Sequence, residues 1–178
     1  KKPEKAIKLA QEAVAMLTEI TQDNALLASN LWSNLGGFYK QVGKFEQAKQ
    51  SMEQGIQILE QYGLTYYHDS ITQITNYAVL LTDMGQPEIG LSVLRKLCRV
   101  IREYNSDTGL DYASVQEAMG GICLTMGDVQ QATTHFKKAM AIYEMVFEAE
   151  PEMIDAKKQE LLGTYTQAGL YLGKKMLE

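Results

Sequence analysis

Residues that mark catalytic, secreted or membrane-spanning proteins are scarce in this sequence. Of its 178 residues, two are Cys, two are His, three are Pro and one is Trp. Two cysteines cannot build the disulfide framework of a small secreted domain, so we expect a reducing compartment and a cytoplasmic location. No apolar run approaches the roughly 18 residues that cross a bilayer, so we expect no membrane partner.

Charge is modest and slightly negative. The chain has 17 Lys and Arg against 22 Asp and Glu, which gives a formal net charge of −5. A general binder of nucleic acid would normally be basic. We therefore expect no nucleic acid among the partners of this protein.

Residue patterns that carry chemistry are also missing. The sequence has no HExxH, no CxxC and no nucleophile elbow, and His68 and His135 lie far apart in it. Cys98 and Cys123 fall at helix-packing positions, where we expect buried, unreactive thiols. We therefore expect no enzymatic activity, no catalytic residue, no metal site and no cofactor.

Glycines, by contrast, follow a period. Gly43, Gly85, Gly127 and Gly169 succeed one another at intervals of 42 residues. Small residues recur at fixed offsets from the first three glycines, seven positions before and five positions after, namely Gly36, Ala78 and Gly120, and Ala48, Gly90 and Ala132, whereas the fourth unit has Leu162 and Lys174 there. Such self-similarity indicates a repeat protein.

Each period predicts two helices. Apolar residues at three- and four-residue spacing favour first helices over 24–42, 71–84, 112–126 and 154–168, and second helices over 45–62, 87–104 and 129–147. The glycine between the two helices lies where a closing residue adopts a left-handed conformation. The polar stretches 67–70 and 105–109 are expected to connect one hairpin to the next.

The period divides the chain into one continuous array. We expect the second helix of a partial repeat in 1–23, repeats in 24–65, 66–107 and 108–149, and a further partial repeat in 150–178. Because a partial repeat is expected at each end, we predict that the array is a piece of a longer one.

The small residues have a packing role in this scheme. Gly36 is expected to face Ala48 across the first full hairpin, as Ala78 faces Gly90 and Gly120 faces Ala132. Without bulky side chains at these positions, the two helices can approach closely. Because one hairpin cannot bury its whole apolar face, stacked hairpins are expected to form a solenoid.

The first full unit resembles the tetratricopeptide repeat family. It reads Trp32-x2-Leu35-Gly36-x2-Tyr39, followed by Gly43 and Ala48. The period of 42 instead of 34 is similar to the repeats of kinesin light chains and of many bacterial signalling proteins, which often carry Asn-Leu-Gly-x2-Tyr in the first helix. The resemblance implies an all-α fold, a right-handed α–α superhelix of antiparallel hairpins, that binds proteins or peptides.

The resemblance also implies a binding surface, because the first helix of each hairpin lines the concave groove of such arrays. The positions it assigns to this groove are Asn30, Ser33, Asn34, Gly37, Lys40 and Gln41 in the first unit, Thr72, Thr75, Asn76, Val79 and Asp83 in the second, and Ser114, Glu117, Gly121 and Thr125 in the third.

This surface is small, polar and nearly uncharged. An Asn side chain can both donate and accept, so it can pair with the main chain of an extended peptide. The basic residues with which some family members hold a carboxylate-ended chaperone tail are absent, which argues against that ligand. The alternative is that Asn34 and Asn76 serve neighbouring helices instead of a ligand.

The function expected from these features is a non-catalytic scaffold that presents a groove to a protein or peptide. One alternative is a regulatory or sensor segment of a larger bacterial transcription or signalling protein. Another is self-association, in which exposed repeat ends form a homo-oligomer.

Overall fold

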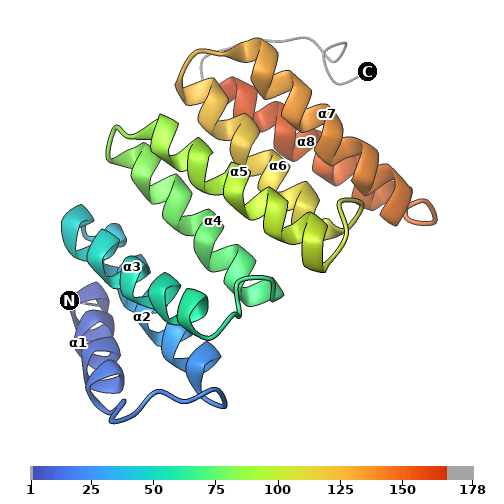
Figure 1. Cartoon of the computed structure of the whole chain (residues 1–178). Helices are drawn as coiled ribbons and strands as arrows, with labels where there is room; N and C mark the ends of the chain where they lie inside the picture. Colours follow the sequence, from blue (N-terminus) through green and yellow to red (C-terminus); the bar gives the residue numbers. More distant parts are fainter. Residues whose placement is uncertain (1, 168–178) are drawn as a thin grey trace. The chain divides into compact units, whose positions relative to one another are not determined.

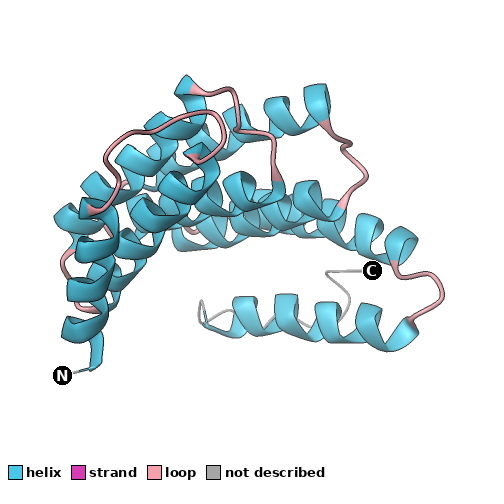
Figure 2. Cartoon of the chain, turned by 90° about the horizontal axis from the view of Figure 1, so that it is seen from below, coloured by secondary structure: helices cyan, strands magenta, loops and turns pink. Residues whose placement is uncertain are grey.

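Helix is the only regular secondary structure over residues 2–167, the part that the structure, a computed structural model, describes. This part contains no strand, and short loops connect its helices (Figures 1 and 2). The eight helices are α1 (Lys2–Ala15), α2 (Ala25–Gln41), α3 (Phe45–Gln61), α4 (His68–Asp83), α5 (Pro87–Tyr104), α6 (Leu110–Thr125), α7 (Val129–Val146) and α8 (Pro151–Gln167). The all-α prediction is confirmed.

Three helices begin earlier than the apolar pattern predicted. α4 begins at His68, so the prediction that residues 68–70 form a connector is wrong. α6 and α8 also begin two to three residues before their predicted starts. These first turns carry Asp or Glu, which favourably faces the positive end of the helix dipole, and this electrostatic signal leaves no trace in apolar spacing.

Left-handed glycines end four of the helices. Gly43, Gly85 and Gly127 have φ values of 74°, 77° and 78°, as the period predicted. Gly63, which the period did not predict, has a φ of 66°. In each case the next amide bonds the carbonyl five residues back, as Lys44 N does to Tyr39 O at 2.9 Å. Gly169 lies outside the described residues.

The chain forms two compact units, Lys1–Gln86 and Pro87–Glu178. Unit 1 contains α1 to α4, and unit 2 contains α5 to α8. Ala78 lies in one unit and Gly90 in the other, so their contact stays a prediction, as do the repeat boundaries.

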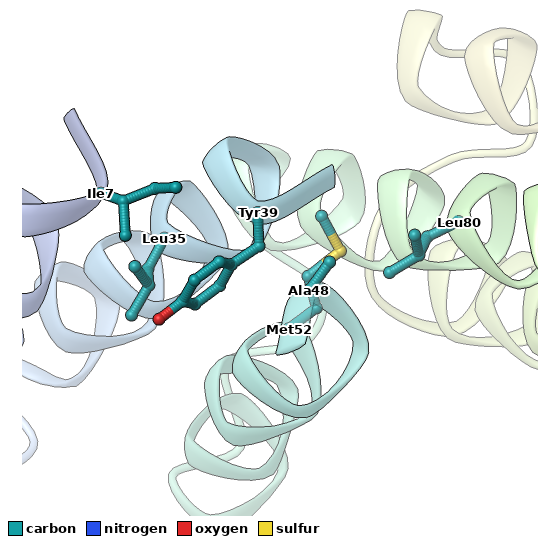
Figure 3. Packing of buried hydrophobic residues seen from close by; sticks show 6 residues of the cluster. All are labelled: Ile7, Leu35, Tyr39, Ala48, Met52 and Leu80. Atoms are coloured by element: carbon teal, nitrogen blue, oxygen red, sulfur yellow. The ribbon is translucent and has the colours of Figure 1, made fainter. Parts of the chain in front are cut away.

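Apolar side chains from all four helices of unit 1 share one core. Its buried members are Ile7, Leu35, Tyr39, Ala48, Met52 and Leu80 (Figure 3). Neighbouring helices approach closely here because Gly36 has no side chain. A Cβ at Gly36 would lie 2.6 Å from Met52 Cγ and 2.9 Å from Ala48 O, so the predicted approach of Gly36 to Ala48 is confirmed.

Unit 2 uses a glycine in the same way. A Cβ at Gly120 would lie 2.4 Å from Phe136 Cε1, and the Phe136 ring in turn meets the Tyr165 ring edge-on at 5.2 Å. Both cysteines are buried, at 5% exposure for Cys98 and 1% for Cys123, as predicted. Burial is the main cause that raises the pKa of each thiol.

Candidate peptide-binding surface

Helix α2 has two chemically different faces. Leu35 and Tyr39 point into the core that α2 shares with α1 and α3. The remaining face carries the residues that the sequence assigned to a groove, all of them at least partly exposed, namely Asn30, Ser33, Asn34, Gly37, Lys40 and Gln41. The helix therefore separates an apolar contact from a polar surface.

A pocket of about 410 Å³ lies on this polar face, between α2 and α4. We call it the Asn pocket. It is lined by Ser33, Asn34, Gly37, Phe38, Lys40, Gln41, Met52 and Asn76. The structure thus brings together six of the residues that the sequence assigned to a groove, from two different repeats.

The charges at the Asn pocket cancel. Lys40 Nζ lies 2.7 Å from Asp83 Oδ2, so α2 and α4 are joined by an ion pair whose side chains are 34% and 42% exposed. What the pocket offers a ligand is therefore its neutral polar groups, among them the amides of Asn34 and Asn76. Among residues 2–167, no side chain hydrogen-bonds either of these amides, so both can donate and accept.

Two other predicted residues are already engaged. The Asn30 side-chain oxygen accepts a bond of 2.8 Å from Gln73 Nε2. The Thr75 hydroxyl donates to the Ile71 carbonyl within α4, at 2.8 Å. These side chains join α2 to α4 or bond their own helix, and they do not line the pocket.

The rest of the predicted set on α4 lies along its accessible side. Thr72 is exposed and Val79 is half-buried, but neither lines the Asn pocket. Along α4, therefore, only Asn76 contributes a side chain to the pocket wall.

Unit 2 carries the predicted residues of the third repeat. Ser114 and Thr125 are exposed on α6, and a Cβ at Gly121 would meet nothing within 4 Å. The Thr125 hydroxyl donates to the Gly121 carbonyl at 3.2 Å. This stretch of α6 is accessible and uncharged, apart from Glu117.

Glu117 lies within a contact between helices. Its carboxylate accepts a bond from the Tyr143 hydroxyl of α7, and Lys157 Nζ of α8 lies 3.7 Å from it. Burial and the Glu117 carboxylate both raise the pKa of Tyr143. The sequence assigned Glu117 to a groove, whereas the structure shows it joining three helices.

The sequence did not identify the apolar floor of the Asn pocket. Phe38 and Met52 line it beside the polar residues. Phe38 lies four residues after Asn34, and this spacing on a helix was the available signal for it. A Cβ at Gly37 would meet nothing within 4 Å, so a ligand can approach the α2 backbone there.

Residues 2–167 contain no group of three or more His, Cys, Asp or Glu side chains arranged to hold a metal ion. Within the same range, no helix is both long and apolar enough to span a bilayer. The chemistry available at the Asn pocket is hydrogen bonding by neutral amides over an apolar floor.

Family models recognise this arrangement of helices. Two models of the tetratricopeptide repeat match the chain, one over residues 29–62 and the other over residues 70–145. This chain belongs to the tetratricopeptide repeat family. The two matches cover most or all of each helix from α2 to α7, so the tetratricopeptide repeats include both walls of the Asn pocket.

Within the family, the chain is similar to kinesin light chains. It is 22% identical over 139 residues to the protein KINESIN LIGHT CHAIN-RELATED 3 of Arabidopsis thaliana. The match takes in 78% of the chain but only 21% of that relative, so the chain spans about a fifth of the relative's length.

Solved structures share the fold at low sequence identity. BtubC (BKLC) from P. vanneervenii is 21% identical, with a TM-score of 0.75, over 94% of this chain and 67% of that one. A kinesin-light-chain candidate from Podosopora anserina, with nearly identical TPR-like repeats, is 17% identical, with a TM-score of 0.73, over 98% of this chain and 83% of that one. These likenesses establish a tetratricopeptide-like all-α fold.

Proposed function

We propose that this chain is a non-catalytic scaffold whose Asn pocket binds a segment of a protein or peptide partner. Tetratricopeptide repeats generally mediate protein–protein interactions. The observation that carries the proposal is the pair of unengaged amides, Asn34 and Asn76, which come from neighbouring repeats and face one pocket.

The chemistry of the Asn pocket favours a main chain over a charged side chain. Each Asn amide can donate to a carbonyl and accept from an N–H of an extended segment. At the pocket, the Lys40 ammonium is already paired with the Asp83 carboxylate, so it does not require a charged ligand. Phe38 and Met52 provide an apolar floor for one side chain of the ligand.

The test begins with short random peptides displayed on phage and selected on this chain. The affinity of the selected peptides is then measured by calorimetry for the parent chain and for Asn34→Ala with Asn76→Ala. Losing two hydrogen bonds at about 1 kcal/mol each should weaken binding at least tenfold. Gln130→Ala on α7, exposed and outside the Asn pocket, is the matched control and should bind as the parent does.

Unchanged affinity in the double variant, with the parent's melting temperature, would remove the Asn pocket from the proposal. A lower melting temperature together with lost binding would assign Asn34 and Asn76 to helix packing, the alternative considered from the sequence.

Self-association is a second candidate, supported by exposed apolar side chains on unit 1. Leu9 of α1 is 55% exposed, Met16 directly after α1 is 79% exposed, and Leu27 of α2 is 59% exposed. One period later, the counterparts of Leu9 and Met16 are Ser51 and Ile58, which are only 4% and 7% exposed. Exposed apolar area of this kind favours contact with another helix, and we propose a second copy of the chain.

Sedimentation velocity over a range of concentrations tests this candidate. The parent should associate, and Leu9→Gln with Met16→Gln should shift it toward monomer while the helix content remains the same. A parent that stays monomeric at the highest concentration would rule out self-association through this surface.

A further inference from the structure

Helix α3 carries a row of glutamines along one face. Gln47, Gln50, Gln54, Gln57 and Gln61 recur at alternating spacings of three and four residues, which places them on one side of a helix. All five are exposed. No prediction from the repeat pattern involved these residues.

The row forms one wall of a groove. Two adjoining depressions of about 570 Å³ and 310 Å³ run along α3 and share Val14, Trp32 and Gln54 in their linings. Together they include all five glutamines. Residues of α1 and of the segment that follows it form the opposite wall, and Trp32 and Leu35 of α2 lie between the two walls. We call this the Gln groove.

The Gln groove and the Asn pocket involve different faces of α2. Trp32, Leu35 and Tyr39 line the groove, whereas Ser33, Asn34 and Gly37 line the pocket. No residue lines both surfaces. A ligand of one surface therefore does not have to contact the other.

Hydrogen-bonding groups in the Gln groove are unengaged. Within residues 2–167, none of the five glutamine side chains bonds another residue, and neither does the Trp32 indole N–H. Each glutamine amide can donate and accept, and the indole can donate. The wall therefore presents the same groups as a peptide main chain, over a length of about 21 Å at 1.5 Å per residue.

Charge is nearly absent from the Gln groove. The single ionic side chain in its lining is Glu53, which accepts a bond of 2.6 Å from the Tyr77 hydroxyl and lies 3.8 Å from Lys49 Nζ. Its charge is thus already compensated. A charged ligand segment would lose its hydration at the groove and gain no opposite charge.

The glutamine row is particular to α3. One period later, the same positions on α5 hold Ile89, Ser92, Lys96, Arg99 and Glu103, and two periods later those on α7 hold Gln131, Thr134, Lys138, Ala141 and Met145. These positions are exposed in all three helices, so the fold does not require an amide at any of them. The repeat pattern therefore does not explain why α3 has glutamine at all five positions.

We propose that the Gln groove binds an uncharged peptide segment in an extended conformation. The glutamine amides bond its main chain, and its side chains alternate between solvent and the apolar floor. At about 3.3 Å per residue, a groove of about 21 Å accommodates roughly six residues of such a segment. The apolar contacts come from Val14 of α1, from Leu17 and Ile20 in the segment that follows α1, and from Trp32 of α2.

The only tryptophan of the chain provides a direct signal of occupancy. Trp32 lines the Gln groove and does not line the Asn pocket. A peptide in the groove should therefore change the tryptophan emission, and a peptide confined to the Asn pocket should not. This difference separates the present proposal from the proposed function.

The test uses short random peptides displayed on phage, selected on the whole chain and then synthesised for titration. The key variant is Gln50→Met with Gln54→Met and Gln57→Met, which preserves side-chain length and helix preference but removes three amides. Two matched controls are Gln41→Met, in the Asn pocket, and Gln130→Met on α7. Circular dichroism and the melting temperature verify that every variant folds.

We expect selected peptides without charged residues that shift or quench Trp32 emission. Their binding to the triple variant should be at least tenfold weaker, while both control variants and Asn34→Ala with Asn76→Ala bind as the parent does. The proposal is overturned if no selected peptide alters Trp32 emission, or if the triple variant retains the parent's affinity. It is also overturned if the selected peptides are charged, or if the triple variant abolishes self-association, which would make a second copy the occupant.

Discussion

The two units achieve the same close approach of helices with different atoms. Gly36 in unit 1 and Gly120 in unit 2 lie two periods apart in the sequence. A Cβ at Gly36 would meet both the Met52 side chain and the Ala48 carbonyl oxygen, whereas a Cβ at Gly120 would meet atoms of the Phe136 ring. The nearest atoms to Gly36 therefore include a backbone oxygen, whereas the nearest atoms to Gly120 all belong to one side chain.

The buried polar contacts differ as well. In unit 1, Gln73 accepts a bond from the Ser29 hydroxyl at 2.5 Å and donates to Asn30, so it joins α4 to α2. In unit 2, Gln116 bonds His135 Nδ1 at 2.8 Å, so it joins α6 to a group that can be protonated. The comparison indicates that the repeat preserves the position of the small residue between the helices, whereas the buried polar side chains of each unit have different hydrogen-bond partners.

The largest expected effect is overpacking at the two buried glycines. Gly36→Ala and Gly120→Ala should each lower the free energy of unfolding by about 1–3 kcal/mol, because the new methyl group would overlap its neighbours. Urea unfolding measures the loss, and hydrogen exchange assigns it to α2–α3 or to α6–α7.

Adjacent glycines provide matched controls. A Cβ at Gly37 or Gly121 would meet nothing within 4 Å, so Gly37→Ala and Gly121→Ala should stabilise their helices by about 0.5–1 kcal/mol. Equal destabilisation by all four substitutions would contradict the packing described for Gly36 and Gly120.

A second substitution beside each glycine should distinguish the packing of the two units. Gly120→Ala should cost about 1 kcal/mol less in a Phe136→Leu background than in the parent, because the obstructing ring is removed. The corresponding difference for Gly36→Ala in a Met52→Ala background should be smaller, because the Ala48 carbonyl would still lie 2.9 Å from the new methyl group. Double-mutant cycles by urea unfolding separate these coupling energies from the cost of truncating each buried side chain, and equal coupling energies would contradict the distinction.

The smallest expected effect is a pH dependence confined to unit 2. Burial, and then Lys138 and Arg95, lower the pKa of His135 below its ordinary value of 6.5. The unfolded chain therefore binds a proton more readily than the folded one. The stabilisation due to neutral His135 is complete above about pH 6.5 and is lost as the pH falls from there through the folded pKa.

Hydrogen exchange at about pH 5.5 and about pH 7.5 measures this difference, with His135→Gln as the control that should remove it. The other histidine, His68, is exposed at the start of α4 in unit 1. A loss of protection in unit 1 as large as that in unit 2 would assign the effect to other groups.

Local rules made much of the fold predictable. The turns at Gly43, Gly85 and Gly127 follow from a backbone conformation that glycine adopts at little cost, so a fixed interval between glycines predicts them. The start of α4 was not predicted, because its first two residues, His68 and Asp69, are polar and exposed, and the charge of Asp69 favours a helix start without any apolar spacing. Helix starts of this kind leave a weaker sequence signal than helix interiors.

The candidate site was only partly predictable. The resemblance to tetratricopeptide repeats placed Asn34 and its neighbours on the groove face of α2, and the period placed Asn76 at the same position of the next unit. The same reasoning put Glu117 in this set, although it bonds Tyr143 of α7 and approaches Lys157 of α8. The spacing of residues along α6 cannot predict that Tyr143 and Lys157, on two other helices, lie beside Glu117.

By itself, the sequence determined a helical repeat protein of the tetratricopeptide type, because period, turn glycines and side-chain spacing are local properties of the chain. Only the tertiary structure decided which side chains remain available. It engaged Asn30 and Glu117 with residues 43 and 26 positions away, respectively. It also left the amides of Asn34 and Asn76 and the glutamine row of α3 open, because hydrogen bonds between distant segments depend on how helices pack.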